Sequence, residues 1–161
     1  TPLTIGETDT HGLIGSGVGP TGPGDITLGA ASSNAMATTA EGGSAGDTAI
    51  RPVIAISVSD NDTQATLGTG GTLTLGGTLD VSAAHQGSTF TDAAGDTESG
   101  QTGVGITIAL AIGTDTALAT TGRDIAADGD VKFAARTVST NRSTARASVP
   151  VMNVTLSEVS R

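Results

Sequence analysis

Large aliphatic side chains alternate with small or polar ones along several short stretches of the chain. In residues 53–59 and 106–112, Ile, Val or Leu occupies every second position, and Ala, Ser or Thr occupies most positions between them. Residues 151–157 resemble the first of these stretches. Because successive side chains of a strand point to opposite faces, this period of two predicts β-strands. No stripe with a period of 3.6 residues occurs, so we expect almost no helix.

A second pattern consists of Gly, a polar residue, and then two apolar residues and an Ala at alternate positions. It occupies residues 24–30, 77–83 and 129–135, so its copies begin 53 and 52 residues apart. Each copy predicts a short strand that is entered through a glycine turn. The two patterns together define a unit of about 53 residues, of which about three fit into the chain.

Two all-β architectures accommodate such a unit. In a parallel β-helix, or β-solenoid, each coil pairs with the next about 4.8 Å away and a thin core runs along the axis. A β-sandwich fills a core about 10 Å thick, which usually requires aromatic side chains. The chain has two Phe and neither Trp nor Tyr. We therefore predict a β-solenoid with about two coils of roughly 26 residues in each repeat, and keep the β-sandwich as the alternative.

The alternation also predicts a core. We expect the large side chains to face inward and the small ones to face solvent, as on a half-buried strand. Replacement of Ile108 by Asp would then bury a charge and unfold the middle coils. The residues expected to form this core are Ile54, Ile56, Val58, Leu79, Val81, Ile106, Ile108, Leu110, Val131 and Phe133.

The repeats divide the chain into two parts. Residues 24–161 form the repetitive solenoid of about three units. Residues 1–23, in which Pro20 and Pro23 lie among several glycines, are expected to be a linker or an incomplete edge coil.

The repeat units also resemble a known class of sequence. The stretch from Ala117 to Ala135 ends in Gly-Asp-Val-Lys-Phe-Ala-Ala and is followed by a tract rich in Ser, Thr and Ala. In this it resembles the repeats of very long bacterial surface and secreted proteins, the haemagglutinin-like adhesins and autotransporter-type passengers. The resemblance extends over roughly residues 24–159. It implies a right-handed parallel β-helix, export from the cell, a structural or adhesive role, and no catalytic residues.

Composition and charge exclude several classes of site and function. Gly, Ala, Thr and Ser supply 89 of the 161 residues, and Cys is absent, so disulfides and thiolate metal sites are excluded. Residues 1–130 carry a net charge of −13 and residues 131–161 one of +4, a polarity that suits end-to-end stacking of copies. An acidic chain without Tyr or Trp offers nucleic acid neither a basic stripe nor a stacking platform. Its longest apolar run, residues 104–112, is too short to span a bilayer.

Candidate chemistry is sparse. Asp60, Asp62, Asp128 and Asp130 form two close carboxyl pairs of the kind that bind Ca²⁺, although solvated turn carboxylates are the simpler interpretation. His85 and one other histidine are the only side chains that would serve as a neutral base. No sequence context for a nucleophile accompanies them, so we predict neither catalytic residues nor a cofactor.

These observations lead to one main hypothesis and two alternatives. The main one is a non-enzymatic, extracellular scaffold, a stalk segment of a bacterial cell-surface or secreted adhesin-type protein. Its partners would be flanking repeats or copies of the same protein, and a host or matrix surface. The first alternative is a self-assembling subunit of an extracellular filament. The second is a β-solenoid that binds ice, a glycan or Ca²⁺.

Overall fold

The computed structural model describes residues 3–14, 21–22 and 24–148, and within them it contains strands and turns but no helix. Residues 151–157, for which the sequence predicts a strand, lie outside the described residues. The strands are β1 (Leu3–Ile14), β2 (Thr21–Gly22), β3 (Ile26–Leu67), β4 (Leu73–Leu75), β5 (Leu79–Thr121), β6 (Ile125–Ala127) and β7 (Val131–Ser148).

Every strand pairing is parallel, which confirms the all-β prediction and differs from the antiparallel sheets of a β-sandwich. The long strands form one sheet in the order β1-β3-β5-β7, and the short ones form a second in the order β2-β4-β6. Ile26 pairs with Leu79, and Leu79 pairs with Val131. Neighbouring strands are therefore one whole repeat apart, and the predicted spacing of about 26 residues is wrong for the described strands.

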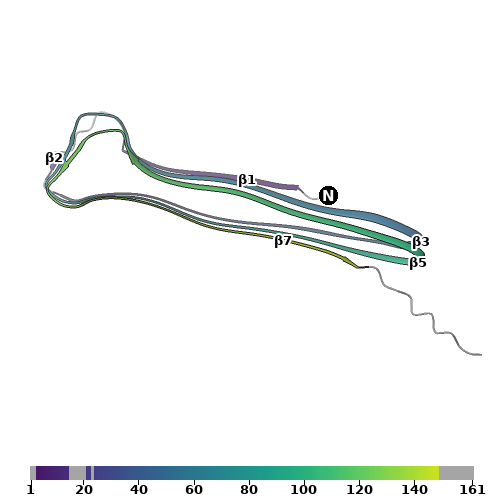
Figure 1. The fold of residues 1–161 in the computed structure, drawn as a ribbon. Coiled ribbons are helices and arrows are strands. Elements are labelled where there is room, and N and C mark those ends of the chain that lie inside the picture. Colours follow the sequence, from purple (N-terminus) through teal and green to yellow (C-terminus); the bar gives the residue numbers. More distant parts are fainter. Residues whose placement is uncertain (1–2, 15–20, 23, 149–161) are drawn as a thin grey trace, which may run out of the picture.

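The long strands form two facing walls that make up an elongated arm (Figure 1). The outgoing wall comprises residues 26–46, 79–99 and 131–148. The return wall comprises residues 3–14, 48–67 and 102–121. β3 runs out along one wall and back along the other, and its pairing with β5 shifts register between Gly46 and Thr48. Gly46 has a φ of +152°, which favours glycine at this reversal.

At the other end the walls diverge around the short strands, and we call this part the head (Figure 1). In the chain, β4 lies between the end of β3 and the start of β5, and leucines from these three strands meet in the head. Leu67, Leu73 and Leu79 are each no more than 1% exposed. Ile26, Leu28 and Ile125 pack against this cluster. The head thus holds a conventional aliphatic core.

The arm has the opposite arrangement, with mostly small side chains inside and the large aliphatic ones outside. Its walls touch through small side chains, and Ala55, Ser57 and Ala93 are completely buried. Ser57 Oγ donates to Thr38 Oγ1 across the interior at 2.8 Å. A Cβ on Gly42 would lie only 2.8 Å from a Val53 methyl. Mostly small and polar side chains therefore face inward in the arm, and the large aliphatic ones of the return wall face outward.

The predicted core is therefore wrong along the arm and partly right in the head. Leu79 and Val81 are buried, as predicted. Val131 and Phe133 share their ladder positions, but they lie in the last described strand and are exposed. The side chains that prove to lie on the outer face of the return wall, either partly or largely exposed, are Ile54, Ile56, Val58, Ile106, Ile108 and Leu110.

Candidate functional site: a buried polar cluster in the arm

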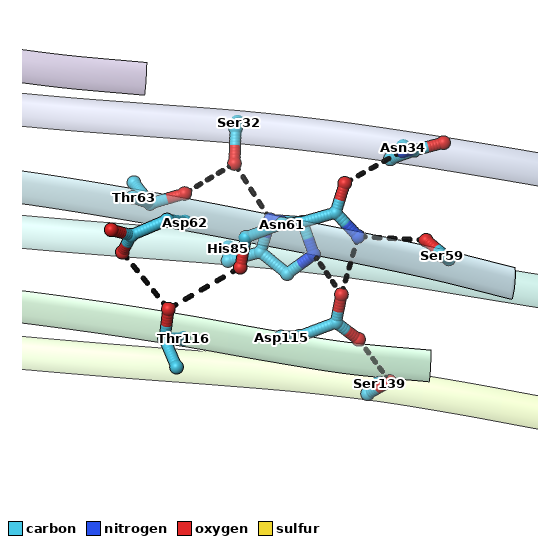
Figure 2. Close-up of polar contacts among 10 residues, drawn as sticks. All are labelled: Ser32, Asn34, Ser59, Asn61, Asp62, Thr63, His85, Asp115, Thr116 and Ser139. Carbon is cyan, nitrogen blue, oxygen red and sulfur yellow. Dashed lines mark hydrogen bonds and ion pairs between the residues drawn. The ribbon is translucent and has the colours of Figure 1, made fainter. Parts of the chain in front are cut away.

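Midway along the arm, polar side chains from both walls meet in the interior (Figure 2). Alternation along each strand turns them inward, and the repeat register stacks them from layer to layer. Ser32 is the ladder partner of His85, and Asn61 is that of Asp115. We call the following residues the polar cluster: Ser32, Asn34, Ser59, Asn61, Thr63, His85, Asp115 and Ser139.

His85 is the centre of the cluster. Its side chain has no exposed surface, and its two ring nitrogens face different partners. Nδ1 lies 2.6 Å from Ser32 Oγ, and Nε2 lies 3.1 Å from Asp115 Oδ1. The Ser32 hydroxyl also lies 2.5 Å from Thr63 Oγ1 on the opposite wall. The imidazole therefore links two layers and both walls.

Asp115 receives hydrogen bonds from both neighbouring layers. Asn61 Nδ2 donates to Oδ1 at 2.5 Å, and the Ser139 hydroxyl donates to Oδ2. Burial opposes ionisation of Asp115, but the hydrogen bonds from Ser139 and Asn61 and the attraction of His85 lower its pKa below the usual 3.8. The ionised carboxylate is thus the form that the fold favours.

Two glycines make room for these side chains. A Cβ on Gly87 would lie 2.9 Å from Asp115 Oδ2 and 2.9 Å from His85 Nε2. A Cβ on Gly113 would lie 2.6 Å from Asn141 Oδ1. Such distances are shorter than normal contacts, so glycine at position 87 is needed for His85 and Asp115 to meet.

His85 lies between Ser32 and Asp115, as the histidine of a Ser-His-Asp hydrolase lies between its serine and aspartate, but the surroundings differ from an active site. The Ser32 hydroxyl is engaged with Thr63, and the imidazole is enclosed. A hollow of about 340 Å³ lies beside them on the outgoing wall. Ser32 and His85 direct their polar atoms away from it, towards the opposite wall and Asp115. The arrangement links neighbouring layers and both walls of the arm.

The predicted calcium residues lie in two separate places. Asp62 accepts hydrogen bonds from Gln64 at 2.5 Å and from Thr116 at 2.9 Å on the outer side of the return wall, and Asp60 is exposed nearby. Asp128 and Asp130 are exposed at the turn that precedes β7. No group of three or more His, Asp or Glu side chains suited to a metal ion occurs in the described part of the chain.

Sequence reasoning gave His85 no partners. The signal that would have found them is the repeat itself, because a residue 53 positions away becomes a ladder neighbour. Ser32 and His85 have this spacing, and Asn61 and Asp115 are 54 residues apart. The contact between His85 and Asp115 depends on how the two walls face each other, and no spacing encodes that.

Two further results complete the description. Across residues 3–14, 21–22 and 24–148, no helix has the length and apolar character needed to cross a membrane. Comparison of the chain with protein-family models, curated proteins and solved structures gives no match.

Proposed function

We propose that the chain is a stalk segment of a large bacterial cell-surface or secreted protein of adhesin type. In this proposal the strands are successive coils of a right-handed parallel β-helix, with one coil per repeat. The role is mechanical and non-enzymatic, and the stalk holds an adhesive part away from the cell. The polar cluster fastens the coils and walls and does not act on a substrate.

The observation that carries the proposal is the unbroken register between β3 and β5. The two strands pair in parallel from Ile26 with Leu79 to Leu67 with Thr121, interrupted only near Gly46. Each layer therefore repeats the backbone hydrogen bonds of the layer before it. A stack of this kind lengthens by adding repeats and requires no new core at each step.

Side chains add ties between successive layers. Lys132 Nζ lies 3.0 Å from Asp80 Oδ2, and Arg146 Nη1 lies 3.3 Å from Asp92 Oδ2. Arg123 is buried at the head and donates from Nε to the Gly68 carbonyl oxygen at 2.6 Å. Each tie joins residues about one repeat apart, as a structure made of stacked coils requires.

The alternative of a self-assembling filament subunit rests on the two edges of the long sheet. Within the described residues, β1 pairs only with β3, and β7 pairs only with β5. Unpaired strand edges are templates for another chain. The outer layer formed by β7 carries Lys132, Arg136 and Arg146, whereas residues 1–130 are acidic, so opposite ends of two copies attract each other.

Electron microscopy of the purified chain separates the two functions. A stalk segment gives discrete elongated particles whose length does not depend on protein concentration. A filament subunit gives open-ended fibres that lengthen with concentration, and that result would replace the stalk proposal with the alternative.

Location is tested independently on the cells that produce the protein. Antibodies against the purified chain should label intact cells or the surrounding medium, because a stalk is exported. Labelling that appears only after the cells are lysed would contradict a surface or secreted role.

A further inference from the structure

The outer side of the return wall carries a continuous apolar surface, which we call the apolar face. Neighbouring strands contribute to it in register, since Ile54 pairs with Ile108 and Ile56 with Leu110. Ile108 is 49% exposed although it belongs to the most aliphatic stretch of the chain. The apolar face consists of Ile50, Ile54, Ile56, Val58, Val104, Ile106, Ile108, Leu110 and Ile112.

This surface is at the upper end of what a monomeric protein exposes as one apolar patch. Its nine side chains expose an area on the order of 600 Å², and the largest apolar patch of a typical monomer is about 300–600 Å². All nine members of the face are aliphatic. The next outward positions beyond Val58 on the same strand are Asp60 and Asp62, so the apolar face ends at an acidic border.

We propose that the apolar face binds the same face of a second copy of this chain, which pairs two arms side by side. Two such faces together bury about 1,200 Å², the area at which specific protein interfaces begin. The face is wholly aliphatic, without the Trp, Tyr or Arg anchors that are typical of interfaces between different proteins. Aliphatic sheet surfaces pack against one another by interdigitation of their side chains, and a second copy supplies a matching surface.

The acidic border determines how the two copies are oriented. If the strands of the two copies ran in the same direction, Asp60 and Asp62 of one copy would lie against the same carboxylates of the other. A two-fold axis that lies in the interface and runs across the strands reverses one arm and places the acidic borders at opposite ends of the interface. The dimer is therefore isologous, with the strands of the two facing sheets running in opposite directions.

Sedimentation velocity on the full chain tests this proposal. Across the micromolar range, the parent chain should form a species of twice 15.5 kDa. Ile108→Asp places an unpaired carboxylate in the centre of the interface and should weaken dimerisation at least about a hundredfold. The matched control is Leu118→Asp, which adds the same charge to an equally exposed aliphatic position on the same strand but outside the apolar face. This control should dimerise as the parent does.

A second variant distinguishes a loss of dimerisation from a loss of folding. Replacement of both Ile108 and Leu110 by Thr keeps side chains that suit an exposed strand and removes most of the apolar contact at the centre. It should be monomeric with an unchanged far-ultraviolet circular dichroism spectrum.

A cysteine probe reports on the geometry, because the chain contains no Cys. Ile54→Cys, which lies beside Ile108 at the centre of the face, should form an intermolecular disulfide under mild oxidation, and Val138→Cys, which is exposed on the opposite wall, should not. A parent chain that stays monomeric throughout would overturn the proposal. Equal weakening of the dimer by Ile108→Asp and Leu118→Asp would also overturn it, since association would then not depend on this face.

Discussion

The head and the arm solve the same packing problem with different residues. In the head, three short strands hold the walls apart, and Leu67, Leu73 and Leu79 fill the space between them. In the arm the walls lie so close together that Ala55 and Ser57 are completely buried between them, and polar side chains occupy the middle of the arm. The comparison shows that the distance between the walls determines which side chains face inward. The larger side chains of the arm are left on the outside.

The head should depend most strongly on large side chains. Leu79→Ala removes a side chain that is 1% exposed from the leucine cluster, and such replacements cost about 2–5 kcal/mol. Denaturant unfolding followed by circular dichroism measures the loss. The partner experiment is Ala93→Gly at a sealed position of the arm, where less apolar volume is removed and the loss should be smaller. Equal losses would remove the distinction between the two regions.

The arm should depend on its buried polar contacts. Asp115→Asn keeps the shape of the side chain, but it removes the charge beside His85 and the full set of acceptors for Asn61 and Ser139. We expect a loss of about 1–3 kcal/mol at neutral pH. Asp62→Asn, on the outer side of the same wall, is the matched control and should cost less.

The same pair of variants predicts a pH dependence. The folded state lowers the pKa of Asp115 below 3.8, so its ionised form stabilises the fold above that pH. The stabilisation is lost as the pH falls through the folded-state pKa. Melting temperatures measured from neutral to acidic pH should show a steeper decline for the parent than for Asp115→Asn. Parallel curves would mean that Asp115 does not contribute to acid sensitivity.

An added methyl group should destabilise the arm at Gly87 but not the turn before β4 in the head. Gly87→Ala forces a methyl group against Asp115 and His85, and overpacking of this kind costs about 1–3 kcal/mol. A methyl group on Gly71 would have no neighbour within 4 Å, so Gly71→Ala should be neutral or slightly stabilising. Thermal unfolding of the two variants provides the comparison. A tolerated Gly87→Ala would show that the walls are free to separate.

The outer face of the arm should tolerate charge. Ile108→Asp, measured at a dilution at which the chain is monomeric, should cost no more than about 1 kcal/mol, because this side chain is half exposed. If the residue faced inward, as the sequence pattern predicts, the same change would unfold the middle of the chain. One denaturation curve distinguishes the two orientations.

The smallest effect is expected at the surface ion pairs. Lys132 and Asp80 are both well exposed, so Lys132→Met should change the free energy of unfolding by about 0.2–1 kcal/mol. Added salt should reduce the difference between this variant and the parent. A loss as large as that caused by Asp115→Asn would mean that surface ion pairs hold the layers together as strongly as the buried polar contacts do.

The repeat carried most of what could be predicted about the fold. The glycine-led pattern at residues 24–30, 77–83 and 129–135 marks the beginnings of β3, β5 and β7. The spacing of 53 gives the ladder pair of Ser32 with His85, whereas Asn61 pairs with Asp115 at a spacing of 54 because the register shifts between Gly46 and Thr48. The prediction of two coils in each repeat was wrong, because hydrogen bonds between neighbours about half a repeat or a whole repeat apart suit the alternation equally well, and the described strands pair a whole repeat apart.

By itself, the sequence determined that the chain forms strands with two unlike faces, repeated at intervals of 52 or 53 residues. It did not determine which face is enclosed, because a period of two is the same whether the large or the small side chains point inward. Tertiary structure decided this through the distance between the walls. The head is wide enough for leucine, as at Leu79, whereas the arm encloses mainly small and polar side chains and places Ile108 outside. The abundance of small residues is therefore the property that lets the two walls of the arm meet.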